Sequence, residues 1–211
     1  MIPWFDPAAE IILRSTRTSP YGRKVRIAIS LLRLGGRITC RDADTRDPND
    51  DLRRQNPLGK MPCLIIGDEP FFDSNVILQV LDGMAGGGRL LPAATDHPAR
   101  YRALRQAVLA DGIADAALLM VYEPRFREPD QVSDTWLGHQ RGKVMRAIGA
   151  FHATPPDPAT PDIVSISLAC ALGYLDWRRP VDWRADNPVL VEWLETFARN
   201  TPAFLETGSE R

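Results

Sequence analysis

The sequence has no excess of charge of either sign. Its 26 Lys and Arg residues are balanced by 27 Asp and Glu residues, and the formal net charge at pH 7 is -1. A dedicated nucleic-acid-binding domain usually carries a basic excess or a stripe of Lys and Arg. Because this chain has neither, we expect no nucleic-acid partner.

Cysteines are also few. The three cysteines, Cys40, Cys63 and Cys170, are odd in number and widely spaced. This pattern excludes a disulfide framework and a zinc site built from thiolates alone. It fits a reducing compartment.

Long hydrophobic runs are missing as well. The longest, residues 163–175, is interrupted by Ser165 and Ser167 and is shorter than the about 20 residues that a spanning helix needs. The first residues show no secretory signal pattern, so we expect a cytoplasmic protein with no membrane partner. What is present is an ordinary globular composition, 44% hydrophobic and 25% charged, in 211 residues, enough for one large domain or two small ones.

The first part of the chain predicts an α/β arrangement of order β-α-β-α-β-β-α. Short apolar runs with turn residues at their ends indicate strands, and apolar residues at helical spacing indicate helices. Ser19 and Ser74 are suitable helix caps, and Gly35-Gly36 is expected to end the first helix. The expected elements are a strand at 10–15, a helix from Pro20, a strand at 37–40, a short polar helix or irregular segment at 48–55, a hairpin with strands 62–66 and 71–72 and its turn at 67–70, and a helix after Ser74.

The second part of the chain predicts helices only. Gly86-Gly-Gly88 breaks the pattern, and Pro92 and Pro98 follow it. Helices are expected at 98–122, 133–152, 162–177 and 187–199, with the Pro-rich segment 154–161 as a stiff connector. We therefore divide the chain into an N-terminal extension (1–10), a first domain (11–85), a linker (86–92) and an all-helical second domain (93–211).

The turn Ser19-Pro-Tyr-Gly22 is the first candidate site. Free backbone N–H groups and partial positive charge at a helix N-terminus favour an anion, and the Ser19 hydroxyl can donate to a bound thiolate. Such a bond is worth about 1.5–3 kcal/mol, and about 1.4 kcal/mol moves a pKa by one unit. A ligand thiol with a pKa near 8.5 would then ionise near neutral pH. The alternative is that Ser19 only caps the helix.

Two further segments resemble parts of a peptide-binding site. In Asn56-Pro-Leu-Gly-Lys-Met-Pro62, a cis bond before Pro62 would expose the Met61 backbone to pair with a peptide ligand, the alternative being an ordinary trans proline. At Asp73-Ser74, the helix N-terminus and the Ser74 hydroxyl can hold a carboxylate, while Asp73 can receive an amine. The alternative there is a simple cap.

Taken together, these motifs resemble the cytosolic glutathione S-transferases of the serine type. The stretches 19–25, 110–116 and 169–175 look most like the bacterial YibF-like branch. The resemblance implies a thioredoxin-like N-terminal domain of order βαβαββα, followed by an all-helical C-terminal domain. One departure is Asp162-Ile-Val-Ser165, where the family often has Ser/Thr-x-x-Asp at the start of its buried helix; Asp162 can still cap.

The resemblance also implies the site residues. Ser19 would be catalytic, stabilising the glutathione thiolate that attacks a small hydrophobic electrophile. Glutathione, the co-substrate, would pair with Met61 beside cis-Pro62, and Asp73 and Ser74 would hold its γ-glutamyl end. Lys60, or one of Arg53 and Arg54, would meet the glycyl carboxylate. The candidate electrophile site is Tyr21, Asp111, Asp115 and Tyr122, and the family implies a homodimer without a metal.

Several residues have a simpler interpretation. Asp111 and Asp115 fit a solvated helix face, and Tyr122, Phe126, Tyr174 and Trp177 fit a core. The three cysteines are interpreted as buried core thiols. His97, His139 and His152 have no partners at metal-ligand spacing and are interpreted as surface or core residues. Trp4 and Phe5 are apolar enough to require a cover.

Three functional alternatives remain open at this point. One is a non-catalytic glutathione- or protein-binding regulator on the same fold, comparable to the stringent starvation protein A. Another is glutathione-dependent reductive or ether-cleaving chemistry. Dithiol oxidoreductase chemistry is disfavoured, because Ser19-Pro-Tyr-Gly22 resembles a glutaredoxin Cys-Pro-Tyr-Cys without either sulfur.

Overall fold

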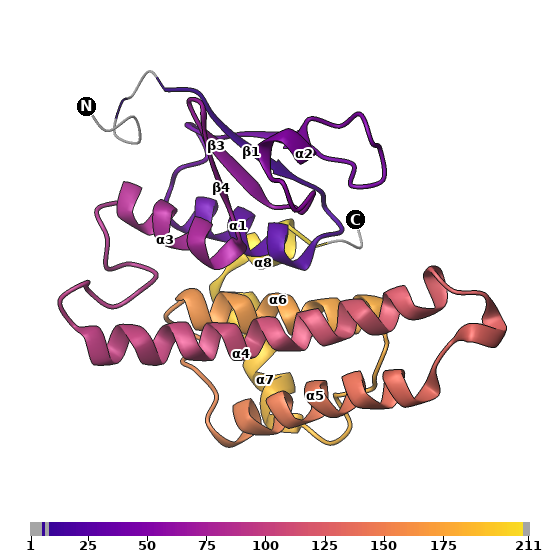
Figure 1. Cartoon of the computed structure of the whole chain (residues 1–211). Helices are drawn as coiled ribbons and strands as arrows, with labels where there is room; N and C mark the ends of the chain where they lie inside the picture. Colours follow the sequence, from indigo (N-terminus) through magenta and orange to yellow (C-terminus); the bar gives the residue numbers. More distant parts are fainter. Residues whose placement is uncertain (1–5, 7–8, 209–211) are drawn as a thin grey trace. The chain divides into compact units, whose positions relative to one another are not determined.

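The computed structural model describes residue 6 and residues 9–208 (Figure 1). Trp4 and Phe5, which were expected to require a cover, lie outside the described residues. The described residues up to Tyr101, together with 206–208, form one compact unit, and Arg102–Leu205 form a second. No helix of the described part is long and apolar enough to cross a membrane.

A four-stranded mixed sheet is the centre of the first unit. Its strands are β1 (Ile11–Ser15), β2 (Thr39–Asp42), β3 (Cys63–Ile66) and β4 (Glu69–Phe72), in the order β2-β1-β3-β4. β1 is parallel to β2 and antiparallel to β3, and β4 is antiparallel to β3. This topology is the predicted thioredoxin-like domain.

Three helices complete the first unit: α1 (Pro20–Leu31), α2 (Leu52–Gln55) and α3 (Ser74–Met84). Figure 1 shows α1 and α3 on the same face of the sheet, where they contact each other. β1 and β3 are buried along their whole length. The central strands are therefore covered by side chains, while the edge strand β2 is exposed throughout.

The second unit is helical, as predicted. Its main helices are α4 (His97–Tyr122, whose first turn belongs to the first unit), α5 (Asp134–Ala153), α6 (Ile163–Arg178), α7 (Pro188–Asn200) and the short α8 (Pro202–Glu206), with the 3-10 turns η2 (Glu123–Arg125) and η3 (Pro129–Gln131). Most residues of α6 are buried, which makes it the centre of this unit. The reversed pair at its start forms a complete capping box, because Asp162 accepts the Ser165 N–H and Ser165 accepts the Asp162 N–H.

Three expected boundaries were wrong for local reasons, and one helix was not predicted. Helix α1 ends at Leu31 rather than at Gly35-Gly36, because Arg33 takes the left-handed conformation (φ 59°) and the Leu34 N–H bonds back to the Ile29 carbonyl. β2 begins two residues late, since it pairs with β1 from Thr39 onward. The hairpin turn is shorter than expected, so β4 already begins at Glu69. Helix α8 was not predicted, because five residues are too few to show helical spacing.

The glycine-rich segment 86–90 is held by one buried carboxylate. Asp82, 3% exposed, accepts the backbone N–H groups of Gly88, Arg89 and Leu90 at 2.7–3.0 Å. Gly86, Gly87 and Gly88 all have positive φ, a conformation that glycine adopts at little cost. The three glycines therefore turn successive N–H groups toward the same side chain.

We predict that Asp82→Ala lowers the free energy of unfolding by about 3 kcal/mol, because several hydrogen bonds to a buried charged group are lost together. Asp82→Asn keeps an oxygen that can accept the N–H groups of Arg89 and Leu90. Its decrease in the free energy of unfolding should therefore be about half as large. Urea denaturation of both variants measures the difference. Equal stability of Asp82→Ala and the parent chain would contradict this role.

Candidate functional site

Ser19 lies where β1 turns into helix α1. Its backbone is extended, and its side-chain oxygen accepts the Gly22 N–H at 3.1 Å, so Ser19 is the N-cap of α1. A hydroxyl that accepts one hydrogen bond keeps its own proton for donation. Ser19 is half-buried, and the cap therefore leaves its hydroxyl able to donate to an anion.

Close packing of α1 on β1 fixes this turn. A Cβ atom at Gly22 would lie 2.0 Å from the Ser15 hydroxyl oxygen, far inside a normal contact. The same hydroxyl accepts a hydrogen bond from Arg26 at 3.2 Å, and Arg26 also donates to the carbonyl of Thr16 at 2.8 Å. The loop that ends at Ser19 is thus held in place by Gly22, Ser15 and Arg26.

The segment before β3 is held by Asn56. This buried amide donates to the Lys60 carbonyl at 2.7 Å and accepts the Leu58 N–H at 3.0 Å. The Met61-Pro62 peptide bond is cis. Met61 packs on a small apolar cluster that includes Leu52, Cys63 and Ile65. The Met61 backbone is therefore positioned by a side-chain amide on one side and by the core on the other.

Helix α3 is capped by Asp73, not by Ser74 as predicted. The Asp73 carboxylate accepts the N–H groups of Asn75 at 2.8 Å and Val76 at 3.4 Å. Asp73 has φ 71°, which costs a non-glycine residue about 1–3 kcal/mol. This strained turn places Ser74 in the first position of the helix, where it is 5% exposed.

A buried lysine joins the two helix starts. Lys24 of α1 is 1% exposed, and its ammonium donates to the Asn75 side-chain oxygen at 2.9 Å. Asn75 follows Ser74 directly, so this bond ties the helix that begins after Ser19 to the turn that carries Asp73 and Ser74. Sequence reasoning missed Lys24, although a lysine within the buried face of an amphipathic helix is an available signal.

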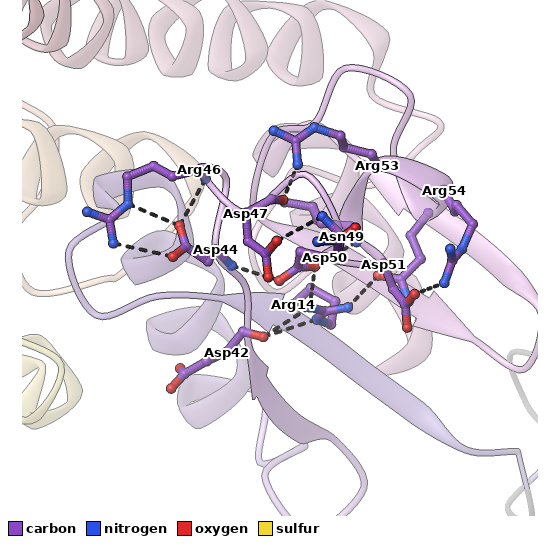
Figure 2. A network of polar contacts seen from close by, with 12 residues as sticks. Arg14, Asp42, Asp44, Arg46, Asp47, Asn49, Asp50, Asp51, Arg53 and Arg54 are labelled. Carbon is purple, nitrogen blue, oxygen red and sulfur yellow. Dashed lines mark hydrogen bonds and ion pairs between the residues drawn. The ribbon is translucent and has the colours of Figure 1, made fainter.

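Arg14 of β1 anchors the loop before α2, as Figure 2 shows. Its guanidinium donates to Asp50 at 2.7 Å, to Gln55 at 2.8 Å and to the Asp42 carbonyl at 3.0 Å. Asp50 in turn accepts the Asp44 and Leu52 N–H groups, and these bonds hold the pKa of its carboxyl below the ordinary value. The network was not predicted, although an arginine inside an apolar strand is an available signal for a buried partner.

The chain is similar to known proteins over most of its length. A family model described as the glutathione S-transferase N-terminal domain matches residues 13–89. The chain is 34% identical over 199 residues to the uncharacterized GST-like protein YibF of Escherichia coli K12, covering 88% of this chain and 95% of that protein. The chain belongs to the glutathione S-transferase family.

Solved structures agree with this assignment. A glutathione transferase family member from Pseudomonas fluorescens Pf-5, with bound glutathione, is 38% identical with a TM-score of 0.86, covering 93% of this chain and 98% of that one. A glutathione S-transferase from Methylobacillus flagellatus KT, with glutathione bound, is 30% identical with a TM-score of 0.83, covering 94% and 98%. The combination of a thioredoxin-like and an all-helical part is thus the fold of this family.

Two of the three cysteines are buried and the third is exposed. Cys63 and Cys170 are buried, as predicted. Burial raises the pKa of the Cys63 thiol to about 11, although the Arg14 charge opposes the shift. Cys40 was wrongly predicted to be buried: it is exposed, because β2 is an edge strand. The pKa of Cys40 is also raised, chiefly by partial desolvation.

Of the three basic residues proposed for the glycyl carboxylate, two already bind the loop before α2. Arg53 donates to the Asp47 and Thr45 carbonyls, and Arg54 pairs with Asp51. Lys60 is exposed beside Met61. Lys60 therefore becomes the stronger of these candidates.

The electrophile candidates are distributed over both units. Tyr21 is half-buried in the first turn of α1; on α4, Asp111 is half-buried and Asp115 is exposed. The prediction that the aromatic residues are core was wrong in part. Tyr174 is buried, but Tyr122 is 36% and Phe126 is 70% exposed, because α4 ends at Tyr122 and Phe126 lies in the loop beyond.

The three histidines lie on α4 and α5. His97 and His139 are exposed and His152 is half-buried. Within residue 6 and residues 9–208, no group of three or more His, Cys, Asp or Glu side chains is placed to hold a metal ion.

We predict that Gly22→Ala is destabilising by about 1–3 kcal/mol, the usual cost of forcing a methyl group into a packed contact. The added Cβ must displace the Ser15 hydroxyl and its bond from Arg26. The double variant Ser15→Ala/Gly22→Ala should recover part of that loss, because the nearest clashing atom is gone. Thermal or urea unfolding of the two single variants and the double variant gives the coupling energy. Purely additive effects would show that this contact does not constrain the turn.

Proposed function

We propose that the chain is a glutathione transferase in which Ser19 stabilises the thiolate of bound glutathione. The observation that carries this proposal is the dual use of the Ser19 side chain: its oxygen accepts the Gly22 N–H, which leaves the hydroxyl proton to donate. Related structures contain bound glutathione. The positive end of the α1 helix dipole adds a field that favours the anion.

The remainder of glutathione is assigned to three positions. The Met61 backbone before Pro62 pairs with the cysteinyl backbone, and Asp73 and Ser74 hold the γ-glutamyl end. Lys60 meets the glycyl carboxylate. Support for the γ-glutamyl position comes from the strained Asp73 turn and from the Lys24 tie to Asn75, since strain is retained where the surroundings enforce it.

The second domain is proposed to bind the electrophile. In this assignment residues 11–85 bind glutathione, residues 86–92 link the domains, and residues 93–211 bind a small electrophile with Asp111, Asp115, Tyr122 and, from the first domain, Tyr21. The thiolate attacks the electrophile, and catalysis consists mainly of lowering the thiol pKa and positioning the reactants. Simple conjugation and reductive or ether-cleaving chemistry differ only in this pocket.

The assembly is proposed to be a homodimer in the cytoplasm. Val108, Leu109 and Leu119 of α4 are 62%, 37% and 40% exposed, and apolar side chains of this kind are often covered by a partner. The cysteines are free thiols, as expected in a reducing compartment.

We predict that Ser19→Ala raises the pKa of the thiol of bound glutathione by about one to two units, because a hydrogen bond worth about 1.5–3 kcal/mol to the thiolate is lost. The alkaline shift should appear in the pH dependence of thiolate absorbance in the bound complex and of the rate with a reactive aryl halide. Affinity for glutathione should change only a few-fold.

Ser19→Thr serves as the matched control, because it keeps both the cap oxygen and the hydroxyl donor. It should retain the parent pH profile. An unchanged profile in Ser19→Ala would remove Ser19 from the mechanism. Glutathione binding without turnover in the parent chain would instead favour the non-catalytic role.

A further inference from the structure

The ends of α4 and α6 carry a group of aromatic and basic side chains that the glutathione site does not use. We call it the aromatic–arginine cluster. One group lies at the end of α4, in η2 and at the residue after it, and the other lies near the end of α6; the ring and arginine contacts are made within each group. Its residues are Tyr122, Arg125, Phe126, Tyr174, Trp177 and Arg178.

The rings meet edge to face. Tyr122 and Phe126 have centroids 5.3 Å apart at an interplanar angle of 81°, and Tyr174 and Trp177 have centroids 6.1 Å apart at 74°. These are favourable geometries for aromatic pairs. Phe126 is nevertheless 70% exposed, so this pairing leaves apolar ring surface in contact with water.

Both arginines lie against these rings. The Arg178 guanidinium carbon is 3.5 Å from the centroid of Trp177, and that of Arg125 is 5.9 Å from the centroids of both Tyr122 and Phe126. In this arrangement the flat face of the guanidinium group contacts the ring. The N–H groups at its edge are then able to donate hydrogen bonds to a planar anion.

Tyr174 interacts electrostatically with residues of both helix ends. Burial raises the pKa of its phenol, while the Arg178 charge, a hydrogen bond from Arg178 and the Arg125 charge oppose the shift; the nearby Tyr122 adds to it. The phenol therefore stays protonated at neutral pH and adds no negative charge beside the arginines.

The positive charge of the cluster is not neutralised by neighbouring acids. Glu123 pairs with Arg127, and Asp176 pairs with Arg184 and accepts from the Trp183 indole. In the described part of the chain, neither Arg125 nor Arg178 forms an ion pair with a carboxylate. Two guanidinium groups and exposed ring faces thus complement a ligand that is both planar and anionic.

We propose that the aromatic–arginine cluster binds planar aromatic carboxylates: the ring of the ligand stacks on the exposed ring of Phe126, and its carboxylate pairs with Arg125 and Arg178. That such a ligand is the electrophile of the reaction rests on the proposed function. In that case the thiolate sulfur bonds to the ring carbon that carries the leaving group, for example chlorine, and chloride departs.

A matched pair of ligands tests the charge requirement. 4-Chloro-3-nitrobenzoate and 4-chloro-3-nitrobenzamide share the ring and the leaving group but differ in the anionic group. We expect calorimetry without glutathione to give at least about tenfold tighter binding of the carboxylate, the lower end of what a hydrogen bond to a charged group contributes. The double variant Arg125→Gln/Arg178→Gln should bind both ligands equally.

Arg141→Gln is the control variant, because Arg141 is exposed on α5 outside the cluster. It should keep the preference for the carboxylate. Equal affinity for the two ligands in the parent chain, or a preference that survives in the double variant, would overturn the proposal. A parallel titration with glutathione keeps the two proposals distinguishable: loss of glutathione binding with the carboxylate preference intact contradicts the transferase reaction and not this site.

Discussion

The candidate site depends on one close contact, between the start of α1 and the end of β1. Only a residue without a Cβ fits at Gly22, because the Ser15 hydroxyl occupies that position and is itself held by Arg26. The contact determines where the helix begins, and the position of Ser19 as its cap follows. A shift of this turn would move both the hydroxyl and the positive end of the helix dipole, which favours an anion.

Helix α1 is in turn bonded to the start of α3 in the first unit. Lys24 brings a buried ammonium to Asn75, beside the strained turn at Asp73. Across the sheet, Arg14 anchors the loop and helix that lead to Asn56 and the Met61-Pro62 bond. The proposed contacts at Ser19, at Met61 and at Asp73-Ser74 thus lie on separate elements, each supported by a buried polar side chain whose hydrogen bonds are specific in direction.

The order of strands and helices could be predicted from the sequence, because apolar periodicity and caps such as Ser19 and Asp162 are local signals. Their ends were harder to place. Arg33 ends α1 in a conformation usually taken by glycine, and Asp73 caps α3 one residue before Ser74. The supporting residues Arg14, Lys24 and Asn75 were missed, because their partners are distant in sequence. The exposure of Cys40 and Phe126 likewise depends on tertiary position, which periodicity does not report.

The central claim is that this chain binds glutathione through the start of α3, and calorimetric titration with reduced glutathione tests it most directly. The account predicts micromolar to millimolar binding that is retained in Asp68→Ala, an exposed turn residue with the same charge change, weakened in Ser74→Ala and abolished in Asp73→Ala/Ser74→Ala. The absence of both heat and thermal stabilisation at saturating glutathione in the parent chain would contradict it.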